Sequence, residues 1–265
     1  MRLDKFLCDM QLGSRSEIKK AAAKGKITVN QEICKDTSRK IVPGEDEVCF
    51  DGSLITYEEY QYYLFYKPYG CITATSDPVQ STVMDIFKGT KGKGLFPVGR
   101  LDKDTEGLLI ITNDGEFGHQ LLSPAKHVEK TYYAIVSGSV TEEDVNLFKK
   151  GVNIGKGVLT RPAKLHVLAA YDSETMVQRR AAQKIPDYFC PRFLPEHPYS
   201  EIEATITEGK FHQVKRMFSA VDKEVLYLKR LSMGEFVLDD SLSPGEFRPF
   251  SEAELQLVKQ YGTGK

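Results

Sequence analysis

The sequence predicts an α+β protein in which a small N-terminal domain precedes a larger one. Its 265 residues are long for a single domain, and 41% of them are apolar, enough to build a buried core. Helical spacing of apolar residues near the N-terminus and β-branched or aromatic runs further along predict both helices and strands. Residues 1–40 contain ten Lys or Arg against five Asp or Glu, although the whole chain has a net charge of −1. This concentration of basic charge favours a polyanion-binding module at the front.

The N-terminal domain is predicted to begin with two helices. Apolar residues at helical spacing within 3–10 indicate a first helix that ends at Gly13. Ser14 followed by Glu17 fits a capping box and opens a second helix that runs to about Lys24. A strand over 26–30 follows, and residues 31–33 pair back on it. The second helix projects basic side chains at i,i+4 steps, namely those of Arg15, Lys19, Lys20 and Lys24.

The larger domain is predicted to start after a linker at 52–60. Residues 62–66 form a dense aromatic run with strand propensity, which Pro68 and Gly70 end in a turn. Further strands are expected over 130–136 and 201–206. Helices are expected over 116–122, over 142–150 with Thr141 as its cap, after the turn that begins at 208, and at the C-terminus with Ser251 and Glu254 as its capping pair. The proline-rich stretch 170–200 is predicted to be an insertion or loop.

The segment 99–115 is the centre of the larger domain. Its first half is a charged loop between glycines, and Leu108–Ile111 is an apolar run that predicts a buried strand. Residues 113–115, with the sequence Asn-Asp-Gly, predict a tight turn with left-handed backbone angles. A charged loop fixed by a rigid strand is a common way to present a reactive side chain, and Asp102 is the candidate. Asp104 and Glu106 are expected to be solvated or locally hydrogen-bonded.

Three groups of residues carry the candidate chemistry. They are Asp102 on its loop, Tyr132 beside Lys130 on a strand, and the pair Lys215 and Arg216 at the start of a helix. A carboxylate close to a cation stays ionised and can act as a nucleophile or general base. The sequence leaves open whether Lys215 or Arg216 faces Asp102. The residues alone therefore predict a carboxylate-centred site that acts on RNA.

The N-terminal order of caps, glycine and strand resembles the small RNA-binding domain of the S4 family. The likeness rests on the segments 2–7, 14–16, 25–30 and 42–46. It implies an S4-like domain over residues 1–51, whose second helix and adjoining turn lie on the RNA backbone. A solvated surface helix is the alternative interpretation. The basic residues expected to contact RNA are Arg2, Lys5, Arg15, Lys19, Lys20, Lys24 and Lys26.

The segment 99–109 resembles the active-site motif of the pseudouridine synthases. The segments 123–124, 129–132 and 208–218 match the other motifs of that family, in order. Together with the front domain they resemble the RsuA branch, which modifies ribosomal RNA. The resemblance implies a catalytic domain over residues 61–265 with a mostly antiparallel mixed sheet flanked by helices. It also implies that uridine becomes pseudouridine without a cofactor or metal, most directly in 16S ribosomal RNA of the small subunit.

The resemblance assigns a role to each candidate. Asp102 is the nucleophile that forms a covalent adduct with the base or the sugar, Tyr132 stacks on the flipped base, and Lys215 pairs with Asp102. Arg100 and Arg216 are expected to bind RNA, because base extrusion needs cations for the backbone. His212 is expected to be structural. A large-subunit 23S enzyme and a non-catalytic ribosome-assembly factor are the alternatives.

Two departures from the family pattern stand out. Ala220-Val221 is followed by Asp222 where the family has glycine, so this turn has to form without one. The stretch 171–200 is longer than expected. Five scattered cysteines without a C-x-x-C pair, and no apolar run of membrane length, predict a cytoplasmic protein with reduced thiols. A monomer is expected. Its expected partner is ribosomal RNA or the immature small subunit, with no membrane partner.

Overall fold

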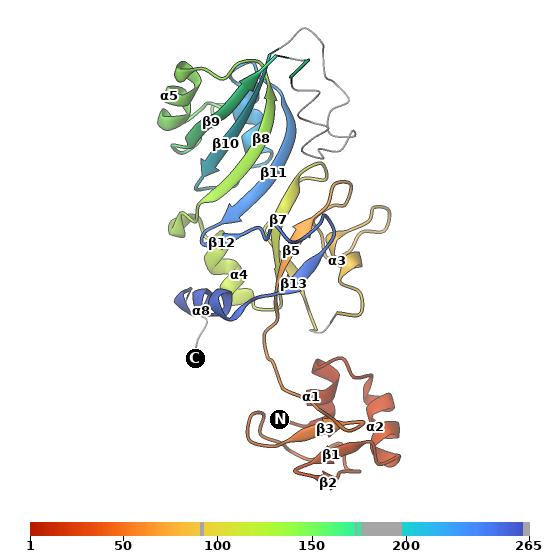
Figure 1. The fold of residues 1–265 in the computed structure, drawn as a ribbon. Helices are drawn as coiled ribbons and strands as arrows, with labels where there is room; N and C mark the ends of the chain where they lie inside the picture. The colour runs from red at the N-terminus through yellow and green to blue at the C-terminus, as the bar shows by residue number, and fades with distance from the viewer. Residues whose placement is uncertain (91–92, 173, 176–197, 262–265) are drawn as a thin grey trace. The chain divides into compact units, whose positions relative to one another are not determined.

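The computed structural model describes residues 1–90, 93–172, 174–175 and 198–261 (Figure 1). These residues form two compact units. The first contains residues 1–62, 87–96 and 111–114, and the second contains 63–86, 97–110 and the chain from 115 onward. The predicted α+β class is confirmed, because helices accompany both a small sheet and a large mixed one.

The first unit contains two helices and a four-stranded sheet with the strand order β2-β1-β3-β4. The pairings β1–β2, β1–β3 and β3–β4 are antiparallel. Apolar residues of both helices and of the central strands form one core. The elements are α1 (Leu3–Asp9), α2 (Arg15–Ala23), β1 (Ile27–Val29), β2 (Glu32–Ile33), β3 (Val48–Phe50) and β4 (Ser53–Leu54). Strand β4 thus lies within the range that the sequence indicated as a linker.

The two helices of the first unit begin largely as predicted, but α1 ends early. Ser14 and Glu17 form a complete capping box at the start of α2. Helix α1 ends at Asp9 rather than at Gly13, and Gln11 adopts a left-handed φ of 56°. The backbone N–H of Leu12 then donates to Leu7 O at 3.0 Å, so the chain already turns away before the glycine.

The second unit is built on a nine-stranded mixed sheet. Its main path is β13-β5-β7-β11-β8-β10-β9, with β12 paired to β11 and β6 paired to β7. The pairings β13–β5, β11–β8, β8–β10 and β10–β9 are antiparallel, whereas β7 and β11 are parallel. The sheet is therefore mostly antiparallel, as the resemblance implied. Its strands are β5 (Tyr62–Lys67), β6 (Phe96–Val98), β7 (Glu106–Thr112), β8 (Lys130–Ser137), β9 (Lys164–Tyr171), β10 (Tyr199–Ile206), β11 (Val225–Met233), β12 (Phe236–Val237) and β13 (Phe247–Pro249).

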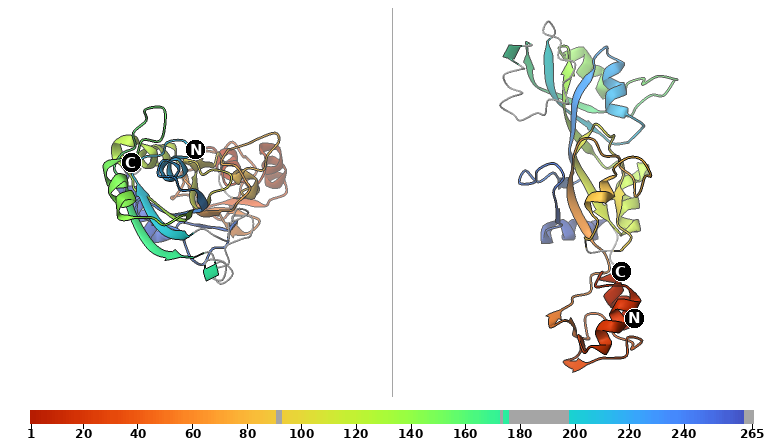
Figure 2. Two further views of the ribbon diagram at one scale, coloured as in Figure 1. Left: turned by 90° about the horizontal axis from the view of Figure 1, so that it is seen from above. Right: turned by 90° about the vertical axis from the view of Figure 1, so that its right-hand side faces the viewer.

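Helices pack against this sheet. They are α3 (Val83–Ile86), α4 (Gly115–Leu122), α5 (Glu142–Lys150), α7 (Gln213–Ser219) and α8 (Glu252–Gln260), with a short 3₁₀ turn at Pro124–Lys126. The views in Figure 2 place α5 and α7 on the same face of the strands β8 to β11. Phe148 of α5 and Phe218 of α7 are fully buried, and their ring centroids are 5.0 Å apart. The predicted caps Thr141 and Ser251 both form capping boxes.

Strand β7 is buried along its whole length, which confirms the buried strand predicted at Leu108–Ile111. Its parallel register with β11 places Gly107 opposite Arg230. Gly107 has a φ of +101°, and an added Cβ would lie 2.3 Å from Arg230 O. Ordinary contacts of this kind measure 3.4–4 Å, so only glycine fits between the two backbones.

The turn predicted after β7 is wrong. None of the residues 113–115 has a positive φ, and Gly115 instead begins helix α4. The side chains explain the difference, because they bond to Gln61 and Tyr62, where β5 begins. Asn113 Oδ1 accepts the N–H of Gln61 at 2.7 Å, and the Asp114 carboxylate accepts the Tyr62 hydroxyl at 2.6 Å.

The turn after α7 does form without glycine. Asp222 takes the left-handed conformation itself, with a φ of 57°. Most of the predicted insertion at 170–200, including Cys190, lies outside the described residues. Strand β9 extends to Tyr171 and β10 begins at Tyr199, so the flanks of that segment are antiparallel neighbours.

Candidate active site

The loop that carries Asp102 is held by its neighbours in the second unit. Thr73 Oγ1 donates to Leu101 O at 2.7 Å and accepts the N–H of Leu101 at 3.1 Å. The N–H of Thr105 donates to Asp102 O at 3.1 Å, which closes a turn around Asp102. The N–H of Gly70 donates to Lys103 O at 2.9 Å. The backbone on both sides of Asp102 is therefore fixed before any ligand binds.

Lys67 supports the same loop from inside the protein. Its side chain is fully buried, and Nζ donates to Pro68 O at 3.0 Å and to Thr105 O at 2.9 Å. Burial lowers the pKa of Lys67, since desolvation disfavours the ammonium form. No local pattern in the sequence indicates that its ammonium faces inward.

Asp102 faces two cationic or potentially cationic groups. Its Oδ2 lies 3.4 Å from Lys215 Nζ, and its Oδ1 lies 3.4 Å from His212 Nε2. The Asp102 side chain is 29% exposed, so the carboxylate is partly shielded yet open to a ligand. Of the two basic residues at the start of α7, Lys215 is the one that approaches Asp102. The contact of His212 with the carboxylate was not anticipated from the sequence.

Asp104 is also part of this cluster. Its Oδ1 lies 2.5 Å from Lys215 Nζ, closer than Asp102 Oδ2, which lies 3.4 Å from the same ammonium. The sequence pattern predicts instead that Asp104 is solvated or locally hydrogen-bonded. Its position two residues after Asp102 lets both carboxylates reach one lysine across a loop of fixed geometry. Lys215 is therefore shared between two carboxylates.

The turn before α7 is fixed by a buried glutamine. Gln213 is 4% exposed, accepts the N–H of Lys210 at 2.8 Å and donates to Glu208 Oε1 at 2.9 Å. Burial acts to raise the pKa of Glu208, but the hydrogen bonds from Lys210 and the Arg161 N–H outweigh it and leave the pKa lowered. An ionised Glu208 thus holds this turn in one conformation.

Arg216 is directed away from Asp102. Its Nε and Nη2 donate to Ile154 O at 3.0 and 2.6 Å, and its Nη1 donates to Phe211 O at 3.3 Å. These bonds tie the turn before α7 to the segment that follows α5. The adjacent residues Lys215 and Arg216 therefore have different tasks, since one reaches the carboxylates and the other anchors backbone.

Tyr132 and Tyr133 lie on opposite sides of β8, as the alternation of a strand requires. Tyr133 packs edge-on against Tyr227, with centroids 5.9 Å apart, in an apolar cluster with Ile135 and Tyr199. Tyr132 is 8% exposed and lies in the register opposite Ala204 on one side. The described residues show no polar contact between Tyr132 and Asp102, so its role at the base remains a prediction.

Glu106 was expected to be solvated or locally hydrogen-bonded, but it is buried and bonds to a residue far along the chain. It is 1% exposed, and its Oε2 accepts the Tyr227 hydroxyl at 3.1 Å. The pKa of Tyr227 is strongly raised, first by burial and then by repulsion from the anionic forms of neighbouring side chains and by this hydrogen bond. The phenol therefore stays protonated and remains a hydrogen-bond donor. The pair links β7 to β11 from inside the sheet.

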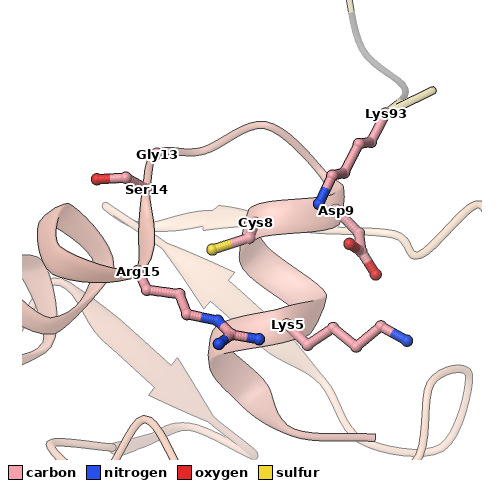
Figure 3. A pocket seen from close by; sticks show the side chains of 7 residues that line it. All are labelled: Lys5, Cys8, Asp9, Gly13, Ser14, Arg15 and Lys93. Atoms are coloured by element: carbon pink, nitrogen blue, oxygen red, sulfur yellow. The ribbon is translucent and has the colours of Figure 1, made fainter. Parts of the chain in front are cut away.

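The predicted RNA-binding residues of the first unit all lie at its surface. Lys19, Lys20 and Lys24 are exposed, whereas Arg2 forms an ion pair with Asp4 and Lys26 forms one with Asp51. Figure 3 shows Lys5 and Arg15 reaching the same side of α1. They line a pocket together with Cys8, Asp9, Gly13, Ser14 and Lys93.

Arg100 is exposed and forms no ion pair with the described part of the chain. No group of three or more potential metal ligands gathers anywhere among the residues that the structure describes. None of the helices described is both long and apolar enough to cross a membrane.

The comparisons with known proteins agree with this architecture. The RNA pseudouridylate synthase model matches residues 61–220, and the S4 domain model matches residues 1–48. An uncharacterized RNA pseudouridine synthase of Bacillus subtilis, YtzG, is 40% identical over 98% of this chain and 99% of its own. Ribosomal small subunit pseudouridine synthase A of Haemophilus influenzae is 36% identical over 98% of this chain and 100% of its own. A crystal structure of a pseudouridylate synthase is 34% identical, with a TM-score of 0.60 over 97% of this chain and 99% of that one.

An S4 domain followed by a mixed-sheet domain with a carboxylate-centred site defines the class of this protein as an RNA-modifying enzyme. The domain match and the full-length similarity both identify uridine as the nucleotide that the enzyme modifies. The chain belongs to the RNA pseudouridine synthase family.

Proposed function

We propose that this enzyme converts a specific uridine of small-subunit 16S ribosomal RNA to pseudouridine in the cytoplasm. The relative from Haemophilus influenzae carries a small-subunit function in its name and matches along its whole length. The S4 domain gives the chain a basic front surface suited to RNA. The observation that carries the proposal is the convergence of Asp102 with Lys215 and His212, from two separate motifs, at 3.4 Å each.

The reaction is redox-neutral and conserves atoms. The bond between C1′ and N1 breaks, the base rotates, and C1′ joins C5, while C5 loses a proton and N1 gains one. We assign Asp102 as the nucleophile that forms the covalent adduct during this exchange. Lys215 orients the carboxylate, because its ammonium lies 3.4 Å from Asp102 Oδ2.

Tyr132 is assigned to stack on the extruded uracil and to assist proton removal. Its ring is almost buried, so a base that reaches it must leave its own stack in the RNA. The exposed Arg100, two residues before Asp102, is assigned to the backbone of the flipped nucleotide. Lys67 and Thr73 form hydrogen bonds to the backbone of the loop that carries Asp102. The Asp102 carboxylate therefore does not have to be ordered by the substrate.

The direct test compares the wild type with Asp102→Asn, which keeps the size of the side chain and removes its charge. Both are incubated with immature small subunits and with deproteinised 16S and 23S RNA, and pseudouridine is mapped by chemical modification and reverse transcription. The wild type is expected to modify one 16S uridine, and Asp102→Asn to lose at least about a thousandfold in rate. Equal modification by both would refute the assignment of Asp102.

The same experiment separates the alternatives. Modification confined to 23S RNA would make the enzyme a large-subunit synthase, and binding without modification would make it an assembly factor. Asp104→Asn tests the shared lysine, since it releases Lys215 from its shorter ion pair without touching Asp102. It is expected to change the rate of modification far less than Lys215→Met, which leaves Asp102 without its ammonium partner.

A further inference from the structure

Phe211 is an exposed aromatic side chain beside the candidate active site. It is 72% exposed, although it lies only two residues before the buried Gln213. Single exposed apolar residues are ordinary on protein surfaces, so exposure alone has no meaning. The contacts of this ring and the way its backbone is held distinguish it from the other exposed apolar residues.

The ring of Phe211 stacks on that of His212. The ring centroids are 3.8 Å apart and the planes differ by 18°. Nε2 of the same imidazole lies 3.4 Å from Asp102 Oδ1. An unbroken set of contacts therefore runs from the carboxylate through the histidine to the phenylalanine. One face of Phe211 is covered by the imidazole, and the high exposure of the side chain leaves the other face for a ligand.

The backbone under Phe211 is rigid. Arg216 Nη1 donates to Phe211 O at 3.3 Å while the same guanidinium is bound to Ile154 O. His212 is held in a left-handed conformation with a φ of 48°, directly before helix α7. A side chain with few rotamers on a fixed backbone loses little entropy when a partner stacks on it. An aromatic ring prepared in this way suits a flat ligand.

We propose that Phe211 is a stacking platform for the nucleobase next to the target uridine in the RNA strand. The inference rests on the proposed function. A uridine that is extruded toward Asp102 leaves its neighbour without a stacking partner, and an aromatic plane adjacent to the site replaces that partner. Every base has a flat face, so this platform adds affinity without demanding one base, while its position fixes the register of the strand.

The test measures RNA affinity in an Asp102→Asn background, so that binding is separated from turnover. The RNA spans the uridine that the wild type modifies. Phe211→Ala is expected to weaken binding at least about fivefold, the lower end for loss of one base–aromatic stack. Phe211→Trp is expected to stay within about twofold of the parent, and Phe211→Leu to behave like Ala. The matched control is Val237→Ala, an exposed apolar residue on β12, which is expected to change nothing.

A second readout identifies the stacked base. An abasic nucleotide is placed in turn on each side of the target, and one of these positions is expected to weaken binding with Phe211 but not with Phe211→Ala. Unchanged affinity of Phe211→Ala, equal behaviour of the Leu and Trp variants, or independent effects of protein and RNA changes would overturn the inference while leaving the proposed function intact. If the wild type modifies no uridine, the proposed function fails and the inference fails with it.

Discussion

Replacing Gly107 by alanine tests whether the close approach of β7 and β11 excludes a side chain at this position. The new methyl group would sit at a φ of +101°, which costs an L-residue on the order of 1–2 kcal/mol. It would also lie 2.3 Å from Arg230 O and 2.7 Å from Arg230 N, so the two strands must separate. Overpacking of this kind costs about 1–3 kcal/mol. The expected loss in the free energy of unfolding is therefore about 2–5 kcal/mol.

The measurement is thermal and urea unfolding of the full chain, with Gly155→Ala as the matched control. Gly155 has a similar φ of +91° but nothing within 4 Å of an added Cβ, so its variant isolates the backbone cost. The melting temperature of Gly107→Ala is expected to fall by about 4–20 °C, and clearly further than that of the control. Equal stability losses in the two variants would refute the claim that the strand contact excludes a side chain.

Three further results are expected. Burial and repulsion from Arg230 lower the pKa of Lys130 to about 8, so its charged form opposes folding below that pH. Between pH 8 and 10.5 the unfolded chain still holds this proton after the folded chain has released it, so the free energy of unfolding of the wild type should rise relative to that of Lys130→Met, by at most about 1.4 kcal/mol per pH unit. Urea unfolding measures both free energies, and a pH dependence that is the same in the two proteins would contradict the prediction. Asp222→Gly should gain up to about 1 kcal/mol by removing left-handed strain, and a lower melting temperature would argue against strain there. The double change Lys19→Ala and Lys20→Ala should weaken RNA binding and reduce its salt dependence, and an unchanged salt slope would exclude both residues from phosphate contact.

The features that the sequence predicted well are those determined within a few residues. The capping boxes at Ser14, Thr141 and Ser251 each join residues three positions apart, and all three are present. Strand β7 was recognisable because four consecutive apolar residues fill its interior. The turn at Asp222 was predicted to form without glycine, and the structure shows how, since aspartate itself adopts the left-handed angles.

The features that were missed depend on residues far apart in the chain. Asp104 meets Lys215 across 111 positions, and Glu106 meets Tyr227 across 121. These pairs exist because β7 and β11 are parallel neighbours, which no local pattern indicates. A charged residue in a loop has the same local signature whether water or a distant lysine is its partner. The inward orientation of Lys67 was equally hidden, because its bonds go to backbone carbonyls.

The parallel junction of β7 with β11 has a thermodynamic consequence for substrate binding. Asp102 lies on the loop before β7, whereas Lys215 lies on α7 and His212 directly before it, and α7 precedes β11. An RNA that is bound by groups from both the loop before β7 and α7 connects the two sides of this junction. Because it binds only the folded chain, it must stabilise that chain by linkage. Damage to the sheet therefore weakens the observed binding only when it leaves an appreciable fraction of the chain unfolded, and bound RNA shifts that equilibrium back toward the folded chain.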